Sequence, residues 1–177
     1  AEDETATPPA TGSLEPAAPA AKEEANVAPA ERLDRLFADY WDAWLELNPV
    51  SATFLGDHRW GDRWPVSISP AHIRAERELL ERSLATAEAI PADELDADHR
   101  LSYELFLHEL RDQLAGYAFP RELTPVNQFR NPANRFARLG SGQSAQPFET
   151  VADYEAFLGR ADGFREWGDQ AIVNMRK

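Results

Sequence analysis

The stretch at residues 47–69, which reads LNPVSATFLGDHRWGDRWPVSIS, decides how this chain is organised because it separates two strongly helical patterns. It gathers charged and indole side chains into one short loop: Asp57, His58, Arg59, Trp60, Asp62, Arg63 and Trp64. Loops on a rigid scaffold often carry function, so one interpretation is that this loop forms a wall of a substrate cleft. The other is that its aspartates and arginines pair beneath the tryptophans and hold the loop together.

Helical patterns lie on both sides of this loop. Residues 30–47 carry apolar side chains at helical spacing, and Pro49 ends the pattern because the residue before a proline avoids the α conformation. Ser69 and Pro70 form a strong start signal, in which an N-cap is followed by proline at the first helical position. The second helix should run to about Ile90.

A third helix is predicted between two further boundaries. Asp96 or Asp98 can cap its beginning, and it should extend to about Gly116. Its buried side is predicted to hold Leu101, Leu105, Phe106, Leu110 and Leu114. Tyr103 and Leu107 widen that side, so we expect this helix to be covered on more than one face.

A long final helix should follow Thr150, because Thr150 and Asp153 form a capping pattern. Its apolar residues are predicted to share one face: Val151, Tyr154, Phe157, Leu158, Ala161, Phe164, Ala171, Ile172 and Met175. No stop signal ends the pattern before Lys177. We therefore expect the chain to be part of a longer helical protein.

Residues 117–148 lose the helical period and contain several prolines and glycines. We predict an ordered, irregular cover there, with a short helix near Arg135. The fold class is therefore all-α, an irregular array of about four main helices with a long proline-rich loop.

The first thirty residues have a different composition from the rest. They contain no aromatic residue and few large aliphatic ones, so they cannot bury enough apolar surface to offset the entropy of ordering. We expect residues 1–30 to form a disordered Ala/Pro/Glu-rich tail and residues 31–177 to form one helical domain.

Charge and composition limit the partners. The formal net charge is -13, which repels a phosphate backbone and argues against nucleic acid as a partner. There are no cysteines, which excludes disulfides and thiolate metal ligands. No apolar run is long enough to span a membrane. The opening segment resembles the spacer that follows a removed export signal, so the predicted location is periplasmic or secreted.

Motifs for catalysis are incomplete. His108 and Glu109 begin a His-Glu-x-x-His pattern, but Asp112 stands where the second histidine should be. No nucleophile elbow and no phosphate-binding glycine loop occurs. We predict no catalytic residue and no metal ligand in this chain. The one interpretation that makes it a complete enzyme uses His58 as a base oriented by Asp57.

Two groups of residues are candidates for substrate binding. The first is Asp57, His58 and Arg59 in the charged loop. The second is Asn127, Gln128 and Arg130, which belong to an amide-rich patch that continues to Asn131, Asn134 and Arg135. Such side chains suit recognition of peptide carbonyls or a carboxylate, and they suit hydrogen bonding within turns equally well.

Four segments, in the same order, resemble a large family of bacterial exported proteins known as a domain of unknown function. They are Leu47-Asn48-Pro49 with Gly56-Asp57-His58-Arg59; His99-Arg100-Leu101-Ser102-Tyr103-Glu104-Leu105; Leu123-Thr124-Pro125-Val126-Asn127-Gln128; and Thr150-Val151 with Asp153-Tyr154 and Phe157-Leu158. The family is similar to zinc metallopeptidases. The resemblance covers residues 33–177.

The resemblance implies a mostly helical protein of several hundred residues. Its zinc motif, a His-Glu pair followed by Pro-Gly-His-His, would lie downstream, and it does not occur in this chain. We therefore expect the N-terminal, substrate-shaping part of an exported metallopeptidase-like hydrolase. The implied partners are the C-terminal polypeptide of the same protein, which would hold the zinc, and a peptide substrate. The alternative is a free-standing periplasmic helical binding module without catalysis.

Overall fold

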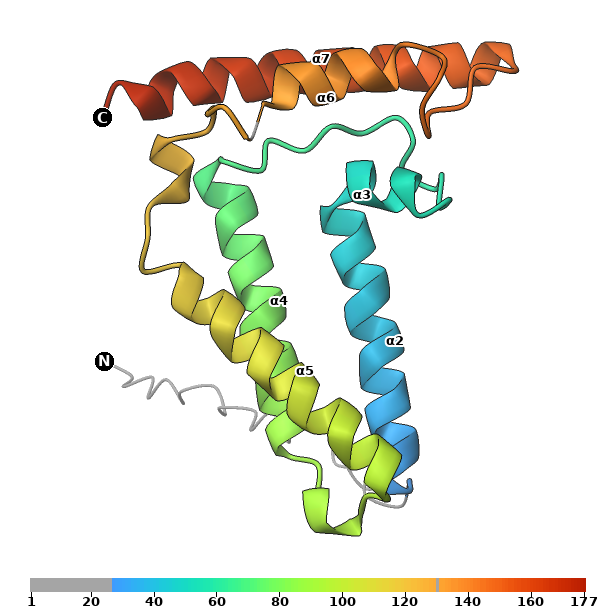
Figure 1. The fold of residues 1–177 in the computed structure, drawn as a ribbon, viewed down its shortest axis with the longest axis vertical. Coiled ribbons are helices and arrows are strands. Elements are labelled where there is room, and N and C mark those ends of the chain that lie inside the picture. Colours follow the sequence, from blue (N-terminus) through green and yellow to red (C-terminus); the bar gives the residue numbers. More distant parts are fainter. Residues whose placement is uncertain (1–26, 130) are drawn as a thin grey trace, which may run out of the picture.

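The computed structural model describes residues 27–129 and 131–177. In this part of the chain there are six α-helices, two short 3-10 turns and no β-strand, which confirms the all-α prediction (Figure 1). The elements are α2 (Pro29–Leu47), α3 (Pro49–Phe54), α4 (Pro70–Glu88), η1 (Ala92–Glu94), α5 (Ala97–Gly116), η2 (Arg121–Leu123), α6 (Pro132–Leu139) and α7 (Val151–Met175). The disordered tail predicted for residues 1–30 falls mostly outside the described residues, and α2 already begins at Pro29.

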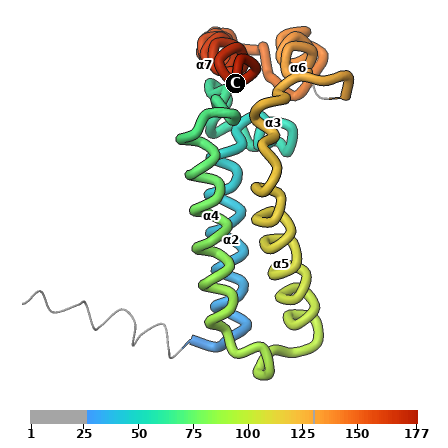
Figure 2. Tube along the Cα trace, turned by 90° about the vertical axis from the view of Figure 1, so that its left-hand side faces the viewer, coloured from blue at the N-terminus to red at the C-terminus, as the bar shows by residue number. Residues whose placement is uncertain are grey.

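Three long helices form the lower part of the molecule, and two helices cross its upper end. Helices α2, α4 and α5 run side by side along the long axis, while α7 and α6 lie across one end of them (Figures 1 and 2). Helix α3 and the loop that follows it lie between these two layers. The stretch at 47–69 therefore connects the bundle to the crossing layer.

The predicted helix boundaries are set by the expected caps. The Ser69 hydroxyl accepts a backbone N–H from the first turn of α4, and the Asp96 carboxylate accepts two from the first turn of α5. Thr150 and Asp153 make a reciprocal capping box at the start of α7. The short helix expected near Arg135 is α6. These signals are local, so they can be recognised without tertiary information.

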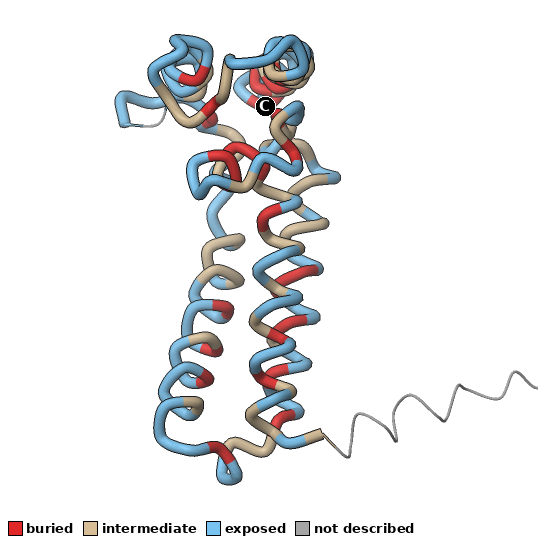
Figure 3. Tube along the Cα trace, turned by 90° about the vertical axis from the view of Figure 1, so that its right-hand side faces the viewer, coloured by how far each residue is buried: buried red, intermediate tan, exposed pale blue. Residues whose placement is uncertain are grey.

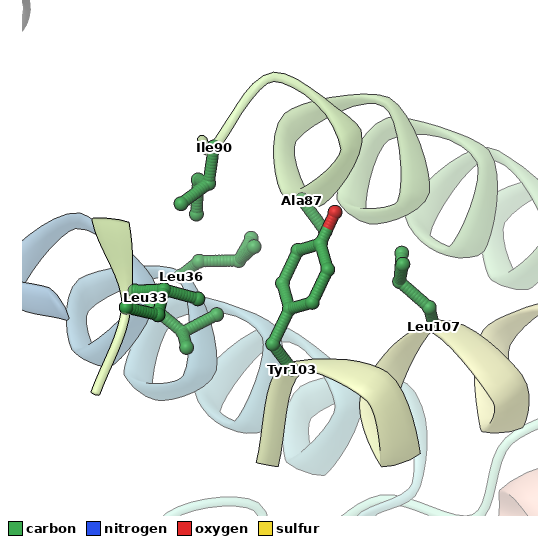
Figure 4. Packing of buried hydrophobic residues seen from close by; sticks show 7 residues of the cluster. Leu33, Leu36, Ala87, Ile90, Tyr103 and Leu107 are labelled. Carbon is green, nitrogen blue, oxygen red and sulfur yellow. The ribbon is translucent and has the colours of Figure 1, made fainter. Parts of the chain in front are cut away.

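The core of the three-helix bundle is mainly aliphatic, with Tyr103 among its buried residues. Its buried residues come from α2, α4, α5 and the connection between the last two: Leu33, Leu36, Ala87, Ile90, Leu95, Tyr103 and Leu107. Figure 4 shows Tyr103 reaching from α5 toward Ala87 of α4. The buried positions recur along the long helices, as expected for amphipathic segments (Figure 3).

The predicted buried side of the third helix was partly wrong. Leu101 and Leu105 are 58% and 60% exposed, whereas Tyr103, Leu107 and Leu110 are buried. Helix α5 has apolar residues on two sides, but in this structure α2 and α4 cover only one of them. Apolar spacing alone does not show which of two such sides meets the neighbouring helices.

The crossing layer has a second, aromatic core. Its buried members are Val50, Trp64, Leu139, Trp167 and Ala171, and the rings of Phe136, Phe157 and Phe164 pack against them. The rings of Phe136 and Phe164 stack with centroids 4.5 Å apart. Helices α6 and α7 are thereby joined to the stretch at 47–69.

The docking of α7 onto residues 49–68 requires a close approach of two backbones. A Cβ added at Gly159 would lie 2.8 Å from the carbonyl oxygen of Asp62, and one at Gly163 would lie 2.5 Å from that of Trp64. Both distances are shorter than van der Waals contact. These two glycines therefore let the loop cross directly over the helix.

Arg160, between these glycines, is fully buried. Its Nη2 donates hydrogen bonds to the Thr53 hydroxyl at 2.5 Å, to the Pro49 carbonyl at 3.3 Å and to the Trp60 carbonyl at 3.4 Å. Burial lowers the pKa of Arg160 to about 10, and the Asp62 carboxylate counteracts part of that shift. One guanidinium group thus joins α7 to α3 and to the loop that follows α3.

The prediction of a single apolar face on α7 was wrong. The side that docks onto residues 49–68 carries Arg160, Trp167, Ala171 and Asn174, and the Asn174 amide donates to the Ile68 carbonyl at 2.9 Å. A second row lies on the exposed side of the helix: Val151, Tyr154, Leu158 and Ile172. Arg160 and Asn174 are polar residues that can be buried because they donate to distant backbone carbonyls. The docking side therefore does not read as apolar in the sequence.

Replacing Gly163 by alanine should destabilise the fold by about 1 to 3 kcal/mol, because the new methyl group meets a backbone carbonyl that cannot rotate away. Gly168 is the matched control, since a Cβ there meets nothing within 4 Å and alanine favours the helix by about 1 kcal/mol. Urea unfolding followed by circular dichroism compares the two variants. Equal effects at the two glycines would contradict the docking geometry.

Candidate functional site

The charged loop is held by ion pairs, as one of its two interpretations expects. Arg59 donates from Nη2 to Asp57 at 2.8 Å and to Asp42 of α2 at 2.6 Å, and its guanidinium lies 4.3 Å from the Trp60 ring centroid. These hydrogen bonds from Arg59 hold the pKa of Asp57 below its usual value. Arg63 pairs with Glu46 of α2 at 3.5 Å, not with the neighbouring Asp62. The loop is therefore tied to the bundle.

His58 is exposed beside this cluster. The side-chain hydrogen bonds that shift the pKa of Asp57 come from Arg59, so the carboxylate that would orient a His58 base is already engaged elsewhere. The geometry therefore gives no support to an enzyme built on His58 and Asp57.

The second group of candidate residues is also solvent-facing. Asn127 and Gln128 are exposed. The side-chain oxygen Oδ1 of Asn127 accepts the backbone N–H of Phe129 at 2.9 Å. Arg130 lies outside the described residues. Asn131 caps α6 by accepting two backbone N–H groups. The side chains of Asn127 and Asn131 thus both accept backbone hydrogen bonds from nearby residues.

A cleft of about 550 Å³ opens between the two segments to which these candidates belong. Its walls come from the stretch at 48–68, from residues 121–135 and from Trp167 of α7. The apolar part includes Val50, Trp64, Pro65, Ile68, Pro125 and Trp167. The uncharged polar part is Asn48, Ser51, Ser67, Thr124 and Asn131. The volume is within the range of small-ligand sites in proteins.

The charges of this cleft are all of one sign. Among the described residues, Arg121 and Arg135 line it, and no aspartate or glutamate does. Burial lowers the pKa of Arg135, whose guanidinium lies 5.3 Å from the Phe54 ring centroid. Two arginines beside indole walls can bind an anionic group attached to an apolar one.

Sequence reasoning found this cleft only in part. None of Asp57, His58, Arg59, Asn127 and Gln128 lines it, although both of their segments do. Asn131 and Arg135, which continue the amide-rich patch, are in its wall. Arg121 was missed, because it stands in a segment without periodicity and away from the patch.

A second cavity, of about 320 Å³, lies where α2, α4 and α5 approach the crossing layer. It is bordered by Glu76, Asp112, Glu122 and Tyr117. Burial, with the Glu76 carboxylate beside it, raises the pKa of Tyr117 to about 12. Arg121 lines this cavity as well as the cleft, and its guanidinium lies beside Gly116 of α5. The two cavities are therefore adjacent, and the carboxylates belong to this one.

The described residues contain no group of three or more His, Cys, Asp or Glu side chains placed to hold a metal ion. His108, Glu109 and Asp112 are all exposed on α5, and Glu109 accepts a hydrogen bond from Gln113 at 2.7 Å. Within the same residues, no helix combines the length and the apolar character needed to cross a bilayer.

The fold and the cleft define an all-α domain with a ligand-sized basic site beneath a crossing helix. The chain belongs to the family described as "Bacterial protein of unknown function (DUF885)", which matches residues 49–177. The match includes every wall residue of the cleft except Asn48. No curated protein and no solved structure matches the chain.

Replacing Arg59 by glutamine should raise the pKa of Asp57 part of the way to its usual value, since it removes the guanidinium hydrogen bonds that lower the pKa most. The backbone N–H of residue 59 still donates to the Asp57 carboxylate. The Arg63→Gln control, which removes the pair with Glu46, should leave the pKa of Asp57 unchanged. A carboxyl-carbon NMR titration measures both variants. In the unmodified chain, the pair stabilises the loop above the usual pKa of Asp57, and this contribution is lost as the pH falls through the lowered value. An unchanged pKa in Arg59→Gln would contradict the loop geometry.

Proposed function

We propose that this chain is the N-terminal, substrate-shaping part of an exported zinc metallopeptidase-like hydrolase, located in the periplasm or secreted. The catalytic segment and its zinc would lie on the C-terminal polypeptide of the same protein. The observation that carries the proposal is the cleft, because it joins two segments of the DUF885 match into one site of ligand size. The resemblance of the family to zinc metallopeptidases supplies the reaction class.

The exposed side of α7 supports a protein partner. Val151, Tyr154 and Leu158 are 75%, 56% and 65% exposed, and they follow one another at helical spacing opposite the docked side. Ile172, which is 47% exposed, lies about four turns further along the same side, beyond charged residues that include Arg165 and Asp169. A row of large apolar side chains in water is typical of a surface that another polypeptide covers. The C-terminal polypeptide would pack along this row, and its metal site would reach the cleft around α7, because the cleft lies on the docked side of that helix.

A binding module without catalysis is the second candidate. It is favoured by the size and the walls of the cleft, which combine apolar side chains with two arginines. The two candidates differ in what a second polypeptide adds. The hydrolase needs that polypeptide for zinc and for activity, whereas the module binds its ligand alone.

Leu158→Glu should reduce association with the C-terminal polypeptide at least tenfold, because it replaces an exposed apolar residue of the row by a charged one. Ala152→Glu is the matched control, since it adds the same charge at an exposed position of α7 outside the row. Co-purification of the two co-expressed polypeptides measures the association.

Zinc content and peptide hydrolysis are measured on the same preparations. The proposal expects stoichiometric zinc and hydrolysis in the two-polypeptide complex and neither in the 177-residue chain alone. Tight stoichiometric zinc on the chain alone would contradict the split site. A complex that lacks both zinc and hydrolysis would favour the binding module.

A further inference from the structure

We propose that the cleft binds the carboxylate of a peptide, with the guanidinium groups of Arg121 and Arg135 holding the anion and the indole walls holding the adjoining apolar side chain. This inference rests on the proposed function and deepens it, because it names the feature of the substrate that the cleft recognises. The ligand class follows from the charge, the walls and the volume of the cleft.

The charge is local and opposite to that of the protein. The chain carries a formal net charge of -13, yet the cleft is lined by two arginines and by no carboxylate. In the described residues, neither guanidinium is among the ion pairs within 4.0 Å, whereas Arg59 and Arg63 of the neighbouring loop are both paired. Arg121 also borders the neighbouring cavity that contains Glu76, Asp112 and Glu122, but it forms no ion pair with them. An anion that enters the cleft therefore meets two arginines that are free of ion pairs within the described residues.

The environment strengthens such an interaction. Trp64 and Trp167 of the wall are 8% and 6% exposed. Arg121 and Arg135 are themselves exposed to solvent, although partial burial is enough to lower the pKa of Arg135. A charged group in partly desolvated surroundings interacts more strongly with an opposite charge than it does in water. The gain is largest for a planar carboxylate, which accepts two parallel N–H groups from one guanidinium.

The walls select what the carboxylate is attached to. Val50, Trp64, Ile68 and Trp167 form an apolar surface, and Ser51 and Thr124 add hydroxyl groups that can bond a peptide backbone. A volume of about 550 Å³ accommodates a short peptide rather than a folded partner. The carboxylate is either the C-terminal group of a peptide or the side chain of an acidic residue.

Isothermal titration of the 177-residue chain tests this with three peptides. They are N-acetyl-Ala-Ala-Phe with a free C-terminus, the same peptide as its C-terminal amide, and N-acetyl-Ala-Glu-Phe amide. At least one of the two anionic peptides should bind ten times more tightly than the neutral amide. Tight binding of the first identifies the C-terminal carboxylate, and tight binding of the third identifies an acidic side chain.

Arg121→Gln and Arg135→Gln should each lower the affinity for the anionic peptide at least tenfold. Neither substitution should change the affinity for the neutral amide. Arg138→Gln is the matched control, because Arg138 is exposed on the same helix as Arg135 but does not line the cleft. Arg121 lies on a different element, so loss of folding in one variant leaves the other as a test.

Equal binding of all three peptides, or no binding of any, would overturn the inference. Equally tight competition by inorganic phosphate would also overturn it, since the site would then be a general anion site. These outcomes are separate from the proposed function, which the zinc content and hydrolysis of the two-polypeptide complex decide.

Discussion

The docking of α7 onto residues 49–68 is the contact on which the rest of the structure depends. Two glycines let the loop backbone cross the helix, and Arg160 joins three groups of the segment from Pro49 to Trp60. Because the docked surfaces are polar as well as aromatic, the helix has one position in which Arg160 and Asn174 meet their acceptors. This position brings Trp167 beside Trp64, and together they form the apolar wall of the cleft.

The cleft is therefore a consequence of packing between segments that are distant in the sequence. The ion pairs of Arg59 and Arg63 fasten the loop to α2, so the loop takes its position from the bundle on one side and from α7 on the other. The ion pairs of the charged loop fix its position, and the cleft is lined by the parts of the stretch on either side of them, residues 48–51 and 64–68. The two arginines of the cleft are Arg121, in the 3-10 turn η2, and Arg135, in the short helix α6.

The helices could be predicted from the sequence because their signals are local. Ser69, Asp96 and Thr150 cap the helices that they were expected to cap. The faces could not be predicted, since α5 and α7 are apolar on two sides and the docked side of α7 hides a buried arginine and asparagine. A cleft lies between the two segments that carry the candidate residues, but none of the described candidates lines it. Asp57 and Arg59 instead bind each other. The sequence did not indicate Arg121 as a cleft residue, because it follows Pro120 in a segment without periodic spacing or a recognisable motif.

Hydrogen exchange in an Arg160→Met variant tests the central claim, that one docking contact organises both the crossing layer and the cleft. Loss of the guanidinium removes three hydrogen bonds between α7 and residues 49–60. We predict that α7 and residues 49–68 lose protection together, while α2, α4 and α5 keep theirs in the separate core of the bundle. Fraying of α7 alone, or an equal loss of protection throughout the chain, would contradict this account.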